Sequence, residues 1–317
     1  MIYMKKTIAS LLLVITCVTA YSQKITFVPQ WTPQAQFAGY YMALEKGFYA
    51  DEGLDVDIRH IGVNSTETAM GLIMNGEAQI GGLQLIQALV ARADGTPLLN
   101  VMQLTQKSGL WCVSRNPISK PEDLDRLKVG RWKVGFSEFC DIIECYKGIK
   151  VNWVPFINGI NLYVFGAVDA TLCYSYSEFI ALKLAMGNIP ENQILKFSEF
   201  GYDCPEDGVY VTEEYYAGNK ETVDKFVRAS KKGWDYAREH RKEALDLVMR
   251  YCNQFHIVTN IAHQTMMLDE YFGLQVNPSN GNVDYAMVSR SVFNEIVGAL
   301  LNTGYITRQL KYEEIIR

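Results

Sequence analysis

Residues 76–104, GEAQIGGLQLIQALVARADGTPLLNVMQL, contain a complete strand–helix–strand unit. The pattern predicts a short strand at 78–81, a helix at 85–94 and a second strand at 98–104, with glycines at the turns. Alternation of this kind is typical of α/β folds, in which helices cover both faces of a mostly parallel sheet.

The same alternation extends on both sides of this unit. Leu54–Arg59 alternates apolar and polar residues with a period of two, as a half-buried strand does. A second block of strands and helices begins near Pro117, and after a strand at 208–212 the chain becomes almost wholly helical. Because such a tail must bury its apolar faces, we expect it to pack back onto the first sheet. The sequence therefore predicts two α/β lobes, the first built from both ends of the chain.

A weak internal repeat occurs once in each lobe. Residues 76–84 and 166–174 each begin with glycine, continue as a short strand and lead into a helix. Chance explains the similarity equally well, because strand-then-helix units are common in α/β proteins. Ligands of open α/β sheets bind beyond the carboxyl ends of strands, near helix N-termini. We therefore expect a ligand site in a cleft between the lobes.

The first residues have the features of a secretory signal. Lys5 and Lys6 precede an apolar run at 8–18, which is too short to span a bilayer. We expect a signal peptide at 1–22, cleavage after Ser22, and a periplasmic or otherwise extracytoplasmic mature protein. Lipidation at Cys17 is the less favoured alternative, because Thr16 is larger than the residue usual before a lipidated cysteine.

Composition and motifs exclude several classes of function. The 317 residues are 49% hydrophobic with a formal net charge of −5 at pH 7, which suits a folded two-domain protein and disfavours a nucleic-acid partner. The sequence lacks a P-loop, a dinucleotide-binding glycine motif, a metalloprotease motif and a nucleophile elbow. No histidine or cysteine cluster has zinc spacing. We therefore expect no catalytic residue, no metal and no cofactor.

Aromatic and polar side chains in the loops at strand ends are the candidates for a ligand site. Rings stack on planar heterocycles, whereas amides, hydroxyls and carboxylates bind their donors and acceptors. Taken singly, each Trp or Tyr ring is better explained by core packing, and each polar residue has an exposed loop position as its alternative. Together, on one face of two lobes, they favour a ligand site. Ser137 is expected to cap a helix whose N–H groups face a ligand. The predicted ligand-binding residues are Trp31, Gln36, Asn64, Gln84, Trp132, Phe136, Ser137, Tyr176, Glu178 and Asp203.

Residues 31–56, WTPQAQFAGYYMALEKGFYADEGLDV, resemble the opening signature of a superfamily of ABC-importer binding proteins. Its members bind alkanesulfonates, taurine or thiamine-pyrimidine precursors. The match continues in segments that include 75–80, 166–170, 176–178 and 205–211. The resemblance implies a type II periplasmic-binding-protein fold, in which two lobes joined by a hinge close on a small molecule. The expected lobes are 23–114 with 208–317, and 115–207.

Within the superfamily, the motifs at 31–33, 176–178 and 205–208 are most similar to the thiamine-pyrimidine branch. The resemblance therefore implies a monomeric binding protein that carries a thiamine-pyrimidine precursor to the permease and ATPase of an ABC importer. Gln34 and Ser177 stand where that branch usually has asparagine, which leaves the ligand open. A sulfonate- or taurine-type anion-binding protein is the alternative from the same superfamily.

The superfamily also contains an enzyme, the thiamine pyrimidine synthase, which consumes an active-site histidine and a lysine-bound pyridoxal phosphate. Phe37 and Leu83 stand at those two positions here. Phenylalanine cannot supply imidazole atoms, and leucine cannot form a Schiff base. The resemblance therefore implies a protein that is not an enzyme, with the synthase as the named alternative.

Overall fold

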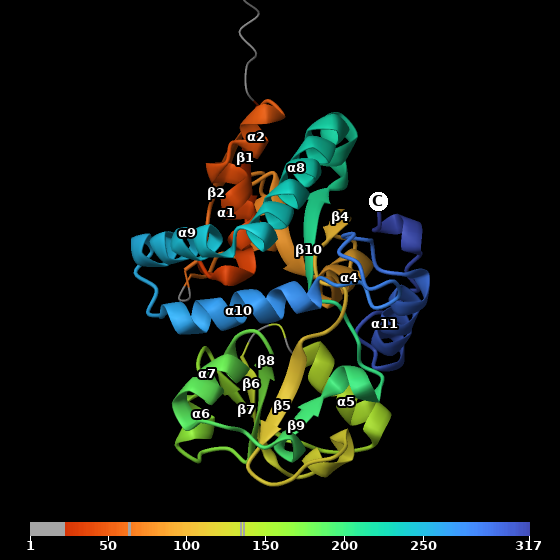
Figure 1. Cartoon of the computed structure of the whole chain (residues 1–317). Helices are drawn as coiled ribbons and strands as arrows, with labels where there is room; N and C mark the ends of the chain where they lie inside the picture. Colours follow the sequence, from red (N-terminus) through yellow and green to blue (C-terminus); the bar gives the residue numbers. More distant parts are fainter. Residues whose placement is uncertain (1–22, 63–64, 134, 136) are drawn as a thin grey trace, which may run out of the picture.

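The computed structural model describes residues 23–62, 65–133, 135 and 137–317. Two five-stranded sheets, each flanked by helices, form two lobes (Figure 1). The predicted signal peptide at 1–22 lies outside the described residues. In the part of the chain that is described, no helix has the length and apolar character needed to cross a membrane.

Each lobe contains one mixed sheet. The first sheet has the order β2 (Leu54–Ile58), β1 (Gln23–Val28), β3 (Ile80–Gln84), β10 (Asp207–Thr212), β4 (Leu98–Gln103). The second has the order β7 (Asn152–Phe156), β6 (Lys128–Trp132), β8 (Ala170–Tyr174), β5 (Leu110–Ser114), β9 (Ile194–Lys196). β1 runs parallel to β2 and β3, and β6 runs parallel to β7 and β8. The expected α/β architecture of two lobes is confirmed.

In each sheet, the antiparallel strand is the one that directly follows a segment crossing between the lobes. The two crossing segments form the hinge. The chain crosses between the sheets at 104–109, before β5, and returns at 201–206, before β10. β5 is antiparallel to β8 and β9, and β10 is antiparallel to β3 and β4. The lobe boundary expected after residue 114 falls at the end of β5, a strand of the second sheet. This strand is buried along almost its whole length, so it has no polar–apolar alternation.

Helices cover both sheets. The first lobe contains α1 (Ala38–Glu45), α2 (Phe48–Asp51), α3 (Ala69–Met74), α4 (Leu85–Ala93), α8 (Glu213–Glu239), α9 (Arg241–Gln254), α10 (Ile261–Leu274) and α11 (Arg290–Asn302), together with the short 3₁₀ helix η1 (Ala35–Phe37). The second lobe contains α5 (Ser137–Lys147), α6 (Asn161–Val164) and α7 (Glu178–Met186).

The helical tail packs on the first lobe, as expected. Gly39 of α1 allows the fully buried Trp234 ring of α8 to lie directly on the α1 backbone, and Gly233 lies against the Gly39 carbonyl. Any larger residue at either glycine would overlap these groups. Asn260 caps α10 by accepting a hydrogen bond from the His263 N–H. The tail thus completes the first lobe.

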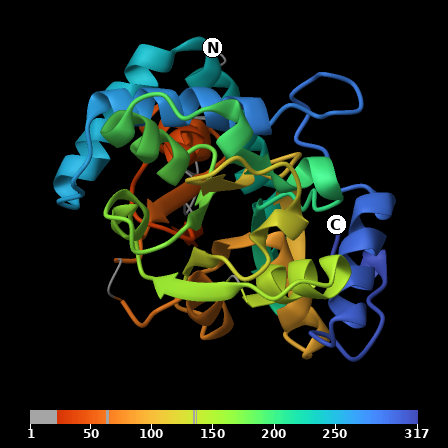
Figure 2. The same ribbon diagram turned by 90° about the horizontal axis from the view of Figure 1, so that it is seen from below.

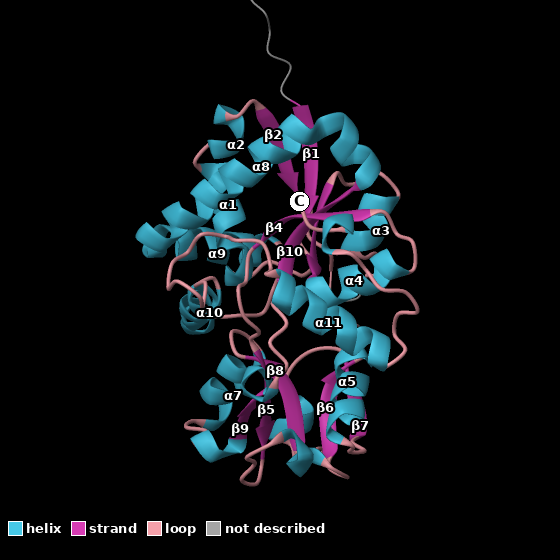
Figure 3. Cartoon of the chain, turned by 90° about the vertical axis from the view of Figure 1, so that its right-hand side faces the viewer, coloured by secondary structure: helices cyan, strands magenta, loops and turns pink. Residues whose placement is uncertain are grey.

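Two tail helices also contact the second lobe. α10 lies between the lobes and packs against both η1 and α7 (Figure 1). Figure 2 shows α7 beside α10 and α5 beside α11, and both pairs are in contact. Figure 3 shows the interface between the lobes from the side. The lobes therefore touch on both sides of the hinge.

Candidate functional site

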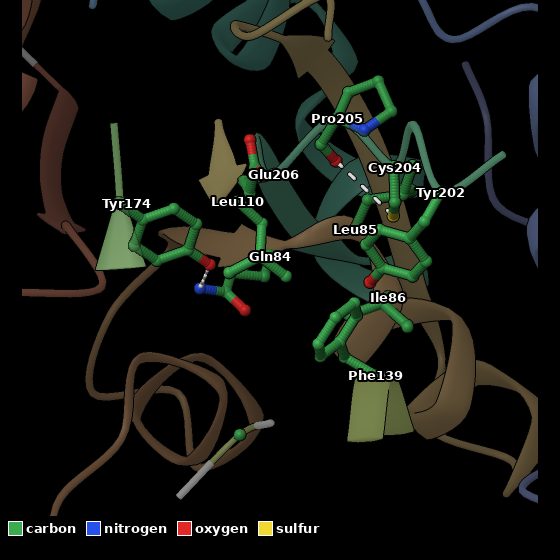
Figure 4. A pocket seen from close by; sticks show the side chains of 11 residues that line it. Gln84, Leu85, Ile86, Leu110, Phe139, Tyr174, Tyr202, Cys204, Pro205 and Glu206 are labelled. Carbon is green, nitrogen blue, oxygen red and sulfur yellow. Dashed lines mark hydrogen bonds between the residues drawn. The ribbon is translucent and has the colours of Figure 1, made fainter. Parts of the chain in front are cut away.

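The ends of two strands from different lobes meet in the interface. β3 ends at Gln84 and leads into α4, and β8 ends at Tyr174 and leads through a short turn into α7. The Gln84 Nε2 donates a hydrogen bond of 2.8 Å to the Tyr174 hydroxyl (Figure 4). The two halves of the internal repeat therefore face each other, as the sequence predicted.

A small cavity lies beside this contact. Its volume is about 20 Å³, which is room for one or two water molecules and far below the roughly 300–1,000 Å³ of typical small-molecule sites. A ring-sized ligand can therefore enter only when the lobes separate or side chains move. Among the described residues, neither lysine nor arginine lines the cavity. Its lining residues are Gln84, Leu85, Ile86, Leu110, Gly135, Phe139, Tyr174, Tyr202, Cys204, Pro205 and Glu206.

A row of aromatic rings crosses the interface next to the cavity. The Trp132 and Tyr174 ring centroids are 5.2 Å apart, and the Tyr174 and Tyr176 rings are stacked at 5.1 Å with an interplanar angle of 16°. The edge of the row meets Tyr271 of α10, whose ring centroid lies 5.3 Å from that of Tyr176. Such a row offers flat apolar faces to a planar ligand once the lobes open.

Glu178 lies at the first turn of α7, beside the ring row. One carboxylate oxygen accepts a hydrogen bond of 3.1 Å from the Tyr174 backbone N–H. Burial raises the pKa of this carboxyl, whereas hydrogen bonds from that N–H and from the Trp132 side chain oppose the rise. The carboxylate is thus held in place by neutral donors.

Asp207, the first residue of β10, is a second carboxylate in the interface. The side chain is 4% exposed, and it accepts hydrogen bonds from Gln30 and Gln36 Nε2 at 2.5 Å and from the Tyr271 hydroxyl at 2.6 Å. Burial raises the pKa of Asp207, and the three donors oppose the rise. Gln36 also donates to the Tyr176 hydroxyl at 3.3 Å, so it links this carboxylate to the second lobe.

Glu206 carries the third carboxyl group in the interface. The side chain is 6% exposed and accepts hydrogen bonds from the Ser108 hydroxyl at 2.7 Å and from the Gly109 N–H at 3.0 Å. Burial raises the pKa of Glu206 to about 8. Among the described residues, Glu178, Glu206 and Asp207 form no ion pair. The interface between the lobes therefore holds three carboxyl groups that no cation neutralises.

The structure brings half of the predicted ligand-binding residues together. These residues line the cavity, belong to the ring row or bond to it, and they are Gln36, Gln84, Trp132, Tyr176 and Glu178. Asn64 and Phe136 lie outside the described residues.

Three predicted residues lie away from the cavity. Trp31 is half-buried, and its carbonyl accepts a 2.7 Å hydrogen bond from His60 Nδ1. Ser137 is exposed and is the first residue of α5. Asp203 is exposed and accepts a 2.7 Å hydrogen bond from the Ser108 N–H, in the hinge.

Four interface residues are missing from the predicted set: Tyr174, Glu206, Asp207 and Tyr271. Tyr174 ends the repeated strand. Glu206 directly precedes the strand at 207–212 and Asp207 is its first residue, so local sequence signals existed for these three. Tyr271 has no such signal, because only the packing of α10 between the lobes brings it to the site.

The two positions that argue against synthase chemistry are core positions. Phe37 is 2% exposed, and its ring centroid lies 5.5 Å from that of His60. Leu83 is 4% exposed within β3. In the part of the chain that the structure describes, no three His, Cys, Asp or Glu side chains are placed to hold a metal ion.

Comparison with known proteins gives both binding proteins and enzymes as relatives. The chain is 26% identical over 238 residues to riboflavin-binding protein RibY of Chloroflexus aurantiacus (72% of this chain, 66% of that protein). It is 27% identical over 232 residues to a 4-amino-5-hydroxymethyl-2-methylpyrimidine phosphate synthase of Aspergillus parasiticus (68% and 67%). It is 26% identical over 231 residues to the formylaminopyrimidine-binding protein of Halalkalibacterium halodurans (69% and 68%). The chain thus spans about two thirds of the length of these relatives.

Solved structures share the fold. The periplasmic aliphatic sulphonate binding protein SsuA of Escherichia coli superposes with a TM-score of 0.66 at 12% identity, over 93% of this chain and 92% of that one. The two-lobed periplasmic-binding-protein fold expected from the sequence is therefore confirmed. The family model described as "NMT1/THI5 like" matches residues 34–244, more than half of the chain, and the chain belongs to this family.

Proposed function

We propose that this chain is the extracytoplasmic solute-binding protein of an ABC importer and that its ligand is a small aromatic heterocycle, in the first instance a thiamine-pyrimidine precursor. The lobes close on the ligand and present the closed form to the permease, whose ATPase drives uptake. The fold supports a binding role, because a ligand that prefers the closed state is all that closure requires.

The choice of ligand rests on one observation: the row of aromatic rings lies beside three carboxyl groups that form no ion pair among the described residues. Trp132, Tyr174 and Tyr176 offer flat faces, and Glu178 offers an acceptor at the edge of the row. An aminopyrimidine has a flat ring and N–H donors, so it complements both features. The riboflavin- and formylaminopyrimidine-binding relatives are consistent with this class of ligand.

The same observation disfavours a sulfonate. An anion in this interface would lie near carboxyl groups that form no ion pair, and the described part of the cavity lining contains no cation to bind it. The synthase is disfavoured for a different reason, since Phe37 and Leu83 are apolar core residues. We therefore propose a protein that binds its ligand without transforming it, and that has neither a metal nor a cofactor.

A thermal-shift panel on the chain from Gln23 onward tests this proposal. The panel compares aminopyrimidines, thiamine, pyridoxal, riboflavin, taurine and alkanesulfonates. A ligand at about a hundred times its dissociation constant stabilises the protein by roughly 2.7 kcal/mol, equivalent to a shift of about 5 °C. We expect this shift with aminopyrimidines.

Two other outcomes would favour the alternative functions. A shift with sulfonates alone would keep the fold and refute the heterocycle. Absorbance of the purified protein at pyridoxal phosphate wavelengths would favour the synthase instead.

A further inference from the structure

The two hinge segments, 104–109 and 201–206, lie side by side and are joined by hydrogen bonds. At the first-lobe end, the Asp207 carbonyl accepts a bond of 2.8 Å from the Leu104 N–H, and the Asp207 N–H donates to the Thr105 hydroxyl at 2.9 Å. Nearer the second lobe the connections come from side-chain carboxyl groups. Asp203 accepts from the Ser108 N–H at 2.7 Å on the exposed side of the hinge.

Glu206 joins the segments on the buried side. Its Oε1 accepts from the Ser108 hydroxyl at 2.7 Å and from the Gly109 N–H at 3.0 Å, and its Oε2 lies 3.2 Å from the same N–H. Gly109 is tightly packed, because an added Cβ would lie 3.0 Å from the Ser175 Oγ of the second lobe. Rotation of one lobe about the hinge must therefore disturb the surroundings of the Glu206 carboxyl.

The same residue is tied to the wall of the cavity. The Glu206 carbonyl accepts a bond of 2.8 Å from the Leu85 N–H at the start of α4, directly after Gln84. Glu206 also lines the cavity together with Gln84 and Tyr174. One residue thus contacts the hinge through its side chain and the ligand site through its backbone.

In the part of the chain that the structure describes, no lysine, arginine or histidine pairs with the Glu206 carboxyl. Asp207, the next residue along the chain, is a second carboxyl group, and Asp203 precedes Glu206 in the same hinge segment. Lys107, on the other segment, is exposed and acts on Asp203. The remaining titratable neighbours are the side chains of Tyr174, Tyr176, Tyr202 and Cys204, which Glu206 affects electrostatically. Burial and the Asp207 carboxyl therefore oppose ionisation of Glu206, and only neutral donors favour it: the Ser108 hydroxyl, the Gly109 N–H and the N–H of Glu206 itself.

We propose that Glu206 is a proton-linked switch in the hinge: the closed lobes hold its carboxyl in the neutral form, and loss of the proton favours opening. This inference concerns the hinge itself and goes beyond the proposed choice of ligand.

The direction of the effect follows from the two environments of the carboxyl group. In the closed form burial raises the pKa of Glu206 to about 8, from an ordinary value of 4.5 that water in an open hinge would restore. At intermediate pH the closed form therefore holds a proton that the open form releases. As pH rises from about 4.5 to about 8, the ratio of open to closed molecules should increase by up to tenfold per pH unit.

Small-angle X-ray scattering from pH 5 to pH 9, without ligand, measures this ratio in the chain from Gln23 onward. The wild-type radius of gyration is expected to increase with pH. Glu206→Gln keeps the shape of the side chain but cannot ionise, so it should stay as compact as the wild type at low pH throughout. Circular dichroism at each pH confirms that both proteins remain folded.

Two further variants separate this switch from a general effect on the hinge. Asp203→Asn removes the exposed carboxylate on the same segment and should retain the wild-type pH dependence. Ser108→Ala removes a donor that stabilises the ionised carboxylate in the closed form, so it should raise the pKa of Glu206 there further and leave the protein more open than the wild type at pH 9. A wild type of constant size, a Glu206→Gln protein that opens with pH like the wild type, or a Ser108→Ala protein no more open than the wild type at pH 9 would each overturn the proposal. No ligand is needed, so an error in the proposed ligand class leaves this test unaffected.

Discussion

Replacement of Gly39 by alanine tests how the two ends of the chain form one lobe. A Cβ on Gly39 would overlap the Trp234 indole ring, and Trp234 is fully buried, so the ring has no free space to move into. Alanine stabilises a helix by about 1 kcal/mol relative to glycine. Overpacking a rigid core typically costs about 1–3 kcal/mol, and a direct overlap with a buried ring costs at least the upper value of that range. We expect a net loss of about 2 kcal/mol in the free energy of unfolding.

Gly298 provides the matched control. It lies inside α11, has ordinary helical backbone angles, and no other atom would lie within 4 Å of an added Cβ. Gly298→Ala should therefore stabilise the protein by about 0.5–1 kcal/mol through helix propensity alone. Urea unfolding followed by circular dichroism measures both variants. If Gly39→Ala were as stable as the wild type, or if both variants shifted in the same direction, the proposed contact between α1 and α8 would be wrong.

Three further predictions concern the site and its surroundings. Glu178→Ala should weaken binding of 4-amino-5-hydroxymethyl-2-methylpyrimidine at least about tenfold in a calorimetric titration, because a hydrogen bond to a charged acceptor is worth about 1.5–3 kcal/mol. Glu191→Ala, at an exposed ion pair, should bind normally, and equal affinities of the two variants would remove Glu178 from the site. Burial lowers the pKa of His60 to about 4 from 6.5, so the unfolded chain takes up the proton first and stability falls as pH drops from about 6.5 towards 4. Between pH 6.5 and 5 this group should contribute a loss of about 2 kcal/mol in urea unfolding, and the loss should disappear in His60→Gln. Tyr174→Phe keeps the stacked ring but removes the hydrogen bond from Gln84 across the lobes, which is worth about 1 kcal/mol. X-ray scattering should therefore show about a fivefold lower ratio of closed to open molecules. An unchanged ratio would show that this bond does not hold the lobes together.

Local patterns in the sequence were sufficient for elements that have one face in water. β2 alternates buried and exposed residues along Leu54–Ile58, and the chain after β10 is mostly helical, as expected, in α8, α9, α10 and α11. The strand at 110–114 was not predicted, because it is buried on both faces between β8 and β9 and carries no alternation. Hydrophobic periodicity arises when one face of an element is buried and the other is exposed. A strand whose two faces are both buried therefore shows no such periodicity.

The site was predicted where its residues end a recognisable strand, as Gln84 does. Trp31 and Asp203 also lie in loops near strand ends, but the Trp31 side chain packs against the hydrophobic core and the Asp203 side chain bonds to the Ser108 N–H on the outer side of the hinge. Loop position alone does not determine which way a side chain faces. That direction depends on contacts with residues far away in the sequence.

The sequence by itself determined the α/β class, the two lobes, the helical return of the chain to the first lobe and the facing pair of strand ends. These features depend on periodicity and on turn residues, which act over a few neighbouring positions. The tertiary structure alone decided that Glu206 and Asp207 are buried between the lobes and that Tyr271 joins them. Burial of a carboxyl group and the donors around it come from segments as distant as Gln30, Ser108 and α10. The chemistry of this interface is therefore set by long-range packing, which no local pattern contains.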